Sequence, residues 1–338
     1  MNSVLVVGGA GYIGGHVCQA LAPHYTPVVY DNFSTGHSWA VRFGPHIEAD
    51  LEDEAALVRA LNHYRPEAVI HLASLINVRD SIANPALYYQ KNLFGTLSLL
   101  KAMVQTHTLN LVFSSTAAIY GTPLHLPITE SHPKNPLNAY GKTKWACEGM
   151  IEDFAHAHGL RFAILRYFNA CGADPSGLLG EAHEPETHLI PLAINAAFNQ
   201  SPLNIYGDDY PTPDGTAIRD YVHVLDLASA HIQALRYLQT HRTSLQANLG
   251  TGTGYSVRQI LNAISRHTQK PIPVNILPRL AHDSAILVAD PTLAKEKLHW
   301  EPTHSSLPTI IATACRWHQS HHARSLLAAL QSTKVNTY

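Results

Sequence analysis

Tyr140 and Lys144 lie four residues apart in the stretch NAYGKTKWACE, residues 138–148. The stretch has the spacing of a helix, and residues four apart share one face of a helix. An ammonium group beside a phenol favours the phenolate and lowers the phenol pKa from its ordinary value of about 10. The pair therefore predicts a general base, although an ordinary surface helix explains the same residues without any chemistry.

A run of hydroxyl side chains ends a predicted strand upstream of this pair. The stretch LVFSSTAAIYG, residues 111–121, is apolar until it reaches Ser114, Ser115 and Thr116. Ligands bind at the carboxyl ends of the strands in an open parallel sheet. Thr116 is therefore expected to orient a substrate oxygen toward Tyr140. Without the tyrosine and the lysine, capping of the strand end would be the better explanation.

A glycine-rich turn follows the first predicted strand, in VLVVGGAGYIGGH, residues 4–16. Gly8, Gly11 and Gly14 have the spacing G-x-x-G-x-x-G, which lets the backbone approach a pyrophosphate at the N-terminus of the next helix. Asp31 ends the second predicted strand, where a carboxylate accepts both hydroxyls of an adenosine ribose and repels a 2'-phosphate. These features predict bound NAD rather than NADP. Asp50 ends a third strand and is placed to contact the adenine, although a surface acid explains it almost as well.

The elements that must position these residues alternate along the first half of the chain. Short apolar runs indicate strands near residues 3–8, 27–31, 68–73, 109–115 and 161–167, and amphipathic stretches such as 54–64 and 85–107 indicate helices between them. Strands that are apolar throughout are typical of a parallel sheet covered on both faces. We therefore predict an α/β fold with a Rossmann-type doubly wound parallel sheet, in an NAD-binding domain over residues 1–168.

The composition and the hydrophobic pattern of the sequence change after about residue 169. The segment GADPSGLLGEAHEPETHLIP, residues 172–191, is rich in glycine, proline and charge, as in a loop or a lid. Shorter strand and helix signals follow it. We expect a smaller α/β substrate domain over residues 169–338, with some chain crossing back to the first domain and the ligand site between the two.

The composition excludes several classes of protein. The formal net charge of −2 gives no global field for nucleic acid or acidic lipid. No apolar run approaches the ~18 residues that span a bilayer. The N-terminal stretch lacks the features of a signal peptide, and the four cysteines are scattered. A cytoplasmic protein is therefore expected, without a membrane or nucleic-acid partner.

Histidine is abundant, with 23 residues, and two clusters look like metal ligands. The stretches AHAH, residues 155–158, and HQSHH, residues 318–322, lie near the ends of helical patterns. They have no cysteine or acidic partner at ligand spacing. Solvated histidines, or histidines that compensate a helix dipole, explain them better, so no metal is expected.

Five stretches together resemble the extended short-chain dehydrogenase/reductase family: GGAGYIG, YDN, FSSTAAIYG, AYGKTK and LRYFNACGADPSG. Within that family they resemble the enzymes that epimerise UDP-hexoses at C4. The likeness continues through ETHLIP, IYGDDYPTPDGTAIRDYVHVLDLA and NLGTGTGYSV, so it covers nearly the whole chain. Residues 207–224 are the most specific part, because they belong to the substrate region rather than to the shared cofactor fold.

The resemblance implies a reversible C4 epimerisation of UDP-glucose and UDP-galactose. Tyr140, as the phenolate, removes the proton of the 4-hydroxyl while hydride passes to NAD. The 4-keto sugar then turns its other face to the cofactor and hydride returns. NAD is regenerated in every turnover, so it should stay tightly bound. The resemblance also implies a homodimer through two long helices, near residues 85–107 and 138–158.

The resemblance implies roles for named residues as well. Asn169 would meet the diphosphate, Leu189 would lie near the uridine, Arg219 would pair with phosphate, and Asp283 would take the uridine ribose. An ion pair with Asp220 or a nearby acid is the structural alternative for Arg219. The implied catalytic residues are Tyr140, Lys144 and Thr116. The implied cofactor-binding residues are Gly8, Gly11, Tyr12, Ile13, Gly14, Asp31, Asn32, Asp50, Leu51, Leu72, Ala73, Asn92, Ser114, Tyr140, Lys144 and Tyr167. The implied substrate-binding residues are Thr116, Asn169, Leu189, Tyr206, Arg219, Arg279, Asp283 and Leu287.

The sequence departs from the family pattern at two positions. Ile76 stands where a lysine near the NAD phosphates is often found, which puts that contact in doubt. PRLAHD, residues 278–283, replaces the frequent Arg-Arg-x-Gly-Asp, so Leu280 stands at the position of the usual phosphate-binding arginine. Arg279 either reaches the diphosphate from one position earlier or leaves that contact unmade.

Four alternatives concern the reaction and its substrate. A 4,6-dehydratase needs a carboxylate pair directly after the threonine, where this chain has Ala117 and Ala118. A UDP-glucuronate 4-epimerase, a decarboxylase or a reductase stays possible, because small pocket changes separate these enzymes. A non-catalytic NAD sensor typically lacks the tyrosine or the lysine, and both are present here. Leu287 stands at a position that lines the sugar pocket, so UDP-N-acetylhexosamines are expected as additional substrates.

Overall fold

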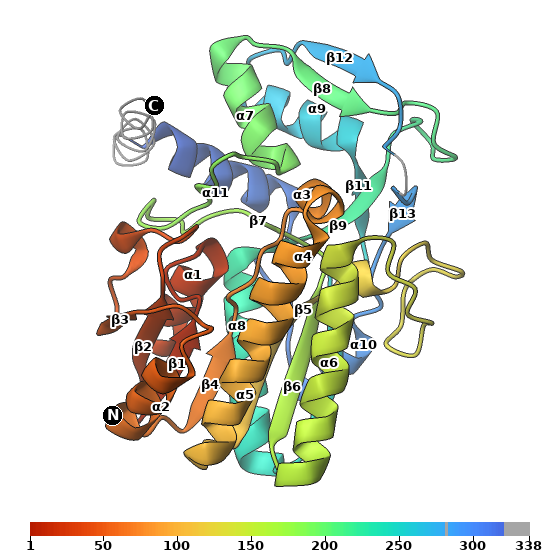
Figure 1. Cartoon of the computed structure of the whole chain (residues 1–338). Helices are drawn as coiled ribbons and strands as arrows, with labels where there is room; N and C mark the ends of the chain where they lie inside the picture. Colours follow the sequence, from red (N-terminus) through yellow and green to blue (C-terminus); the bar gives the residue numbers. More distant parts are fainter. Residues whose placement is uncertain (281–282, 321–338) are drawn as a thin grey trace.

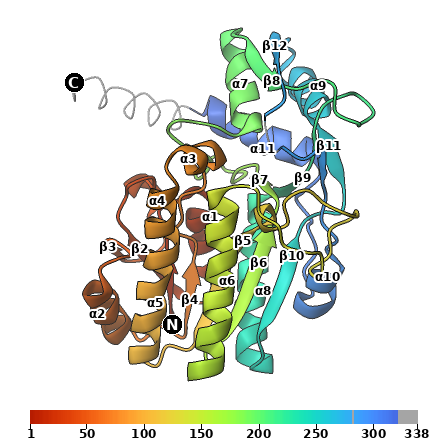
Figure 2. The ribbon, with the colours of Figure 1, turned by 45° about the vertical axis from the view of Figure 1, so that its right-hand side comes forward.

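The larger part of the molecule is built on a seven-stranded sheet in the order β10-β6-β5-β4-β1-β2-β3, with every pair parallel (Figures 1 and 2). The computed structural model describes residues 1–280 and 283–320. The strands are β1 (Ser3–Val7), β2 (Thr26–Asp31), β3 (His46–Glu48), β4 (Ala68–His71), β5 (Asn110–Thr116), β6 (Arg161–Tyr167) and β10 (Leu245–Leu249). The order β3-β2-β1-β4-β5-β6 is that of a doubly wound dinucleotide-binding sheet, as the sequence predicted.

Both faces of this sheet are buried, which explains why its strands are apolar throughout. Val4 and Val6 point into a core with α1 and α8, while Leu5 and Val7 point into a second core with α2, α5 and α6. Side chains alternate between the two faces of a strand, so each strand supplies both cores. The helices are α1 (Tyr12–Leu21), α2 (Glu54–Tyr64), α5 (Gly95–Gln105), α6 (Ala139–His158) and α8 (Val224–His241).

The predicted helix over residues 85–107 is present as three connected pieces. Helix α4 (Pro85–Tyr88) leads into a π-helical turn, η2 (Tyr89–Phe94), and then into α5. A short helix, α3 (Val78–Ala83), precedes them. Turns of π-helix inside longer helices often occur at functional sites, and η2 carries Asn92, whose contacts are described below.

A smaller region lies beyond one end of the large sheet (Figures 1 and 2). Its strands form a sheet in the order β11-β9-β13, with β7 also paired to β9, and a separate parallel pair of β12 and β8. Their bounds are β7 (Asn169–Cys171), β8 (Leu203–Tyr206), β9 (Ile218–His223), β11 (Gly254–Ser256), β12 (Val274–Leu277) and β13 (Ile286–Leu287). Helices α7 (Leu189–Asn199), α9 (Val257–Thr268) and α11 (Leu307–Gln319) pack around a core of their own.

The chain returns from the smaller region to the large sheet. Strand β10 pairs with β6 at the edge of that sheet, and α8 contributes Leu227, Leu235 and Leu238 to the same core as α1. Helix α10 (Thr292–Leu298) adds Leu298 to that core. The sequence predicts that some chain after residue 169 crosses back to the first domain, and β10, α8 and α10 are elements that lie on the large sheet. The apolar run alone does not say which sheet it joins.

None of the described helices is both long and apolar enough to cross a bilayer.

Candidate active site

A cavity of about 940 Å³ opens where the strands of the large sheet end. Its wall is formed by the turns after β1, β2, β4 and β5, by the start of α6, and by the segment 179–188 from the far side. This volume is at the upper end of the range for ligand sites in proteins. The parallel sheet thus gathers residues from distant parts of the sequence at one edge.

The glycine-rich turn lies against the backbone of the next strand end. Gly8 has φ +83°, and a Cβ built on it would lie 2.5 Å from the Ala73 backbone nitrogen. A Cβ on Gly14 would lie 2.1 Å from the Gly8 carbonyl oxygen, so helix α1 packs on this turn only with glycine there. Gly11 is the N-cap of α1 and supplies no side chain to cover the first turn. The N-terminal N–H groups of α1 therefore face the cavity as a cradle for a pyrophosphate.

Asp31 connects this turn to the end of β2. Its Oδ2 accepts a hydrogen bond from the Ala10 N–H at 3.0 Å, and its Oδ1 accepts one from the Phe33 N–H at 2.9 Å. Burial raises the pKa of Asp31, and the two backbone donors oppose that rise. Asn32 extends the same wall and donates to Asp50 Oδ2 at 3.0 Å. The predicted ribose and adenine residues are thus adjacent and line one part of the cavity.

Helix α6 positions Tyr140 and Lys144. Asn138 caps the helix by accepting a hydrogen bond from the Gly141 N–H at 2.9 Å, which fixes the first turn where Tyr140 lies. The Thr116 side chain lies close enough to Tyr140 to lower the pKa of the phenol. The Thr116 hydroxyl also accepts from the Ala118 N–H at 3.1 Å, so the threonine is held at the end of β5. The three predicted catalytic residues therefore meet at one point of the cavity wall.

The electrostatics of this pair differ from the prediction. Burial raises the pKa of Tyr140, and the Thr116 side chain only partly offsets that rise. Burial also lowers the pKa of Lys144 to about 8, and its Nζ lies 4.6 Å from the ring centroid of Phe113. The net pKa of Tyr140 is therefore raised and not lowered as the sequence predicts, because desolvation dominates at a site this deeply buried.

Asn92 is the one predicted cofactor residue that does not line the cavity. It is 2% exposed and holds both backbone groups of Leu75, accepting from its N–H at 2.8 Å and donating to its carbonyl at 3.1 Å. It also donates to Thr143 Oγ1 at 3.2 Å, which ties η2 to α6 beside Lys144. The structure thus places Asn92 behind the wall, as a positioning residue. The other predicted cofactor residues all line the cavity.

Most of the predicted substrate residues lie outside this cavity, in the smaller region. Thr116 and Asn169 line it, whereas Leu189, Tyr206, Arg219, Arg279, Asp283 and Leu287 do not. Arg219 forms an ion pair with Asp283 rather than with Asp220. Asp220 is buried and accepts hydrogen bonds from the N–H groups of Thr251, Gly252 and Ala289. The structural alternative for Arg219, an ion pair with a nearby acid, is therefore present, and the acid is Asp283.

Arg279 lies over an aromatic ring and beside an acid. Its guanidinium carbon is 4.5 Å from the centroid of the Tyr210 ring, and its Nε is 2.5 Å from Asp209 Oδ1. Tyr206 similarly lies under Arg79, whose guanidinium carbon is 4.4 Å from the ring centroid. Each predicted phosphate-binding arginine therefore already has an acidic partner.

Several cavity residues were not predicted as site residues. Ile76, at the position where a lysine is frequent, does line the wall, and Lys91 lies in the same wall but pairs with Asp50 and Glu52. The Nε2 of His37 is 2.6 Å from the Ala182 carbonyl oxygen, which joins the turn after β2 to the segment 179–188. The lid-like composition of residues 172–191 was the only sequence signal for this second wall.

Comparisons with known proteins agree with this geometry. Residues 4–250 match the family described as "NAD dependent epimerase/dehydratase family". A UDP-glucose 4-epimerase from Rhizobium meliloti (strain 1021) is 47% identical over 94% of this chain and 97% of its own length. A crystal structure of UDP-glucose 4-epimerase from Brucella ovis in complex with NAD has a TM-score of 0.91 and 52% identity, over 94% of this chain and 98% of that one. The UDP-Glc/GlcNAc 4-epimerase from Campylobacter jejuni has a TM-score of 0.82 and 35% identity, over 94% of this chain and 99% of that one.

Proposed function

Because the chain belongs to the NAD dependent epimerase/dehydratase family, we propose that it catalyses the reversible C4 epimerisation of UDP-glucose and UDP-galactose with bound NAD. The observation that carries this proposal is the convergence of Tyr140, Lys144 and Thr116 in a cavity that also contains the glycine-rich turn and Asp31. The cofactor and the general base thus share one wall. A hydride acceptor and a proton acceptor must lie close together for an alcohol to be oxidised reversibly.

The cavity residues fit NAD on the structure's own geometry. Gly8 and Gly14 leave no room for a Cβ, so the turn packs tightly against the next strand end and α1, and Gly11 leaves the start of α1 uncovered for a diphosphate. Asp31 lies at the end of β2, where a carboxylate accepts the hydroxyls of the adenosine ribose. NAD held there would supply the hydride acceptor for C4 and the hydride donor for the opposite face of the keto sugar. The chain's own residues hold the cofactor and move the proton.

Tyr140 takes the proton of the sugar 4-hydroxyl, and Thr116 orients that oxygen. The Thr116 hydroxyl lowers the pKa of Tyr140, which supports a shared contact of the two groups with one substrate oxygen. Burial disfavours the phenolate, so a positive charge must accompany it. Lys144 on the next helical turn supplies one charge, and the oxidised nicotinamide ring supplies a second when it is bound.

The nucleotide end of the substrate lies toward the smaller region. Asn169 lines the cavity where β7 begins, and Arg219 lies on β9, which pairs with β7. We propose that the diphosphate replaces Asp283 as the partner of Arg219, which releases Asp283 for the uridine ribose. Arg279 would exchange Asp209 for phosphate in the same way, and Leu189 and Tyr206 would lie near the uridine.

A broader substrate range is proposed from Leu287. Leu287 packs beside Phe168 against the cluster of Ala117, Ile119, Tyr120 and Ile128, directly after Thr116. Phe168 lines the cavity. Leu287 does not itself line the cavity, but a leucine in this cluster occupies less space than a tyrosine would, so UDP-N-acetylhexosamines are proposed as additional substrates. The C. jejuni relative described above is named for both UDP-Glc and GlcNAc.

A homodimer is proposed through the outer faces of α4, η2 and α6. Leu87, Tyr89, Phe94 and Trp145 are large apolar side chains that are 37–58% exposed, and all lie on these helices. A second copy of the chain would cover them.

We also propose that the chain divides into two domains, over residues 1–168 and 169–338, with β10 and α8 crossing back to the first.

The test of the reaction is a proton NMR time course of the purified protein with UDP-galactose and no added cofactor. Formation of UDP-glucose would establish 4-epimerisation and would show that NAD copurified. No conversion after NAD is supplied would overturn the substrate assignment, and UDP-glucuronate and UDP-N-acetyl sugars would then be tested in the same assay.

A further inference from the structure

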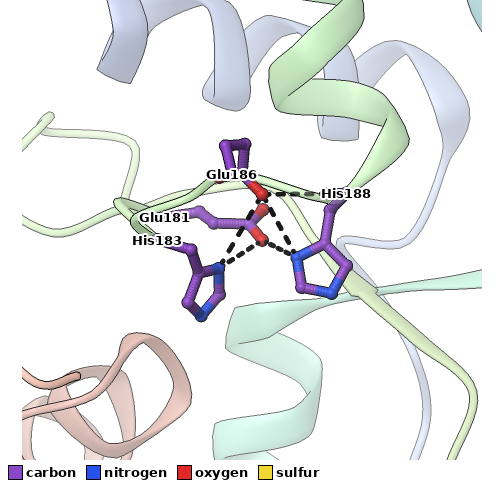
Figure 3. A group of neighbouring side chains, drawn as sticks. All are labelled: Glu181, His183, Glu186 and His188. Atoms are coloured by element: carbon purple, nitrogen blue, oxygen red, sulfur yellow. Dashed lines mark hydrogen bonds and ion pairs between the residues drawn. The ribbon is translucent and has the colours of Figure 1, made fainter. Parts of the chain in front are cut away.

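Two glutamates and two histidines converge in the segment 181–188 (Figure 3). One ligand atom from each of Glu181, His183, Glu186 and His188 lies within 4.8 Å of all the others. These residues have the spacing E-x-H-x-x-E-x-H and lie in the loop between β7 and α7. They are separate from the two histidine-rich stretches that the sequence suggested, of which His321 and His322 lie outside the described residues.

We propose that Glu181, His183, Glu186 and His188 form a site for one divalent transition-metal ion of the zinc class. The site is independent of the proposed reaction. The metal would join the two ends of the segment 181–188 and hold it as a wall of the cofactor cavity.

The distances within the cluster suit a tetrahedral ion. His183 Nδ1 lies 3.0 Å from Glu181 Oε1 and 4.0 Å from Glu186 Oε1, and His188 Nδ1 lies 2.5 Å and 3.4 Å from the same two atoms. Ligand bonds of about 2.0–2.2 Å in a tetrahedron place neighbouring ligand atoms roughly 3.3 Å apart. The four atoms therefore need to move by less than about 1 Å to share one ion.

A second observation is the position of the His188 ring nitrogen. Its Nδ1 is buried and forms ion pairs with both Glu181 and Glu186, but it makes a well-directed hydrogen bond with neither carboxylate. Two carboxylate oxygens and a second imidazole thus converge on one buried nitrogen, as the ligands of a shared cation do. An ion between the four side chains would satisfy this nitrogen.

The donor set identifies the class of metal. Two imidazole nitrogens with two carboxylate oxygens suit zinc and its neighbours, whereas magnesium and calcium prefer oxygen alone. Glu181 is 4% exposed, so its negative charge must be balanced locally.

The backbone around the cluster already holds the ligands. Trp317 Nε1 donates to the Glu181 carbonyl at 2.8 Å. Glu186 Oε1 accepts from the N–H groups of Thr187 at 2.8 Å and His188 at 2.9 Å. Such outer partners orient metal ligands and raise the affinity of a site.

The site adjoins the glycine-rich turn. Glu181, His183 and His188 line the same cavity as Gly11 and Tyr12, and the rings of Tyr12 and His183 are 6.2 Å apart. The Tyr12 hydroxyl donates to the Gly172 carbonyl at 2.6 Å, at the start of the same loop. A metal at the cluster would therefore stiffen a loop that is fixed to the cofactor side at its other end.

The experiment measures bound metal in the full chain, purified without a histidine tag and without metal-affinity resin. Mass spectrometry of the desalted protein is expected to find about one equivalent of zinc per chain after incubation with Zn²⁺. His183→Gln/His188→Gln is expected to lower zinc affinity at least about tenfold. The matched control is His156→Gln/His158→Gln, which removes two histidines at the exposed end of α6 and should bind zinc as the parent does.

A second measurement distinguishes loss of the metal site from misfolding of the variant. Co²⁺ added to the parent protein should give the visible absorption of a four-coordinate nitrogen–oxygen site, and Zn²⁺ should raise its Tm by a few degrees. Both effects should be absent in Glu186→Gln/His188→Gln with a normal circular dichroism spectrum. Equal zinc content in the cluster variant and the parent, or no zinc retained by the parent, would overturn the proposal.

Discussion

The two sides of the cavity are built in different ways. On the cofactor side, Gly8, Asp31 and Thr116 lie at the ends of strands in one buried sheet, and backbone hydrogen bonds hold them. On the substrate side, Arg219 and Arg279 are long side chains in the smaller region, and each is paired with an acid. The first side is fixed by secondary structure, whereas the second depends on pairs of side chains that a ligand can exchange.

This difference separates the two tasks of the site. Strand ends and helix starts place groups to within a fraction of an ångström, which hydride and proton transfer require. Ion pairs at a partly exposed surface contribute little to stability, so their exchange for a diphosphate costs little. Changes on the cofactor side should therefore act on kcat, and changes on the substrate side should act on KM.

Tyr140→Phe should have the largest effect. Loss of the phenol removes the general base, so kcat for UDP-galactose should fall by about 10²–10⁴-fold. NAD content and the affinity for UDP should stay near those of the parent, because the ring remains in place. Steady-state kinetics and the cofactor released on denaturation measure both. A fall in kcat of less than tenfold would contradict the assignment.

Arg219→Ala should have the second-largest effect, and this effect should be on the substrate side of the cavity. The loss of a charged partner for phosphate should raise KM for UDP-galactose by roughly 10–100-fold, with a much smaller change in kcat. Asp283→Asn is the matched variant, because it removes the acid of the same ion pair and leaves the arginine free. If Arg219→Ala lowers only the Tm and leaves KM unchanged, the arginine is a structural partner of Asp283 alone.

Leu287→Tyr tests whether this residue sets the size of the sugar pocket on the substrate side. The larger ring should cut turnover of UDP-N-acetylgalactosamine by at least about tenfold, since steric exclusion at a packed wall exceeds the effect of a single methylene. Turnover of UDP-galactose should change by less. Coupled assays on both sugars give the ratio, and equal ratios in parent and variant would remove Leu287 from the sugar pocket.

The smallest expected effect is on the pH dependence of stability, and it comes from buried histidines on the cofactor side. Burial lowers the pKa of His16 and His231 to about 4 and that of His71 to about 3, all below the ordinary value of 6.5. Between these values the unfolded chain binds more protons than the folded one, so stability should fall as the pH drops from 6.5 toward 4. The Tm of His231→Gln should fall less steeply over this range. Parallel curves for parent and variant would exclude His231 as a contributor.

The sequence predicted the parts of the fold that follow from local pattern. The alternating apolar runs located the strands β1, β2, β4, β5 and β6, and the glycine spacing located the start of α1, because both signals lie within about ten residues. The Tyr140 and Lys144 pair was found in the same way from helical spacing. These features depend on backbone geometry alone.

Other features depend on contacts between distant residues, and the sequence could not show them. β10 has a strand pattern, but only pairing with β6 places it in the large sheet. The hydrogen bond of Asn92, on the π-helical turn, with Leu75 joins residues 17 positions apart. The raised pKa of Tyr140 comes from burial, which spacing does not reveal. The pairing of Arg219 with Asp283 joins residues 64 positions apart.

The return of β10 to the large sheet bears on the order in which the protein is made. On the ribosome, β6 emerges long before residues 245–249, and until then its outer edge has no neighbouring strand. Helix α8, which covers the face beside α1, also emerges late. A nascent chain that ends before residue 249 would expose an apolar strand edge, which is a template for pairing with other chains. The cofactor half, although encoded first, therefore acquires its last strand only after β7, α7, β8 and β9 of the substrate half have been synthesised.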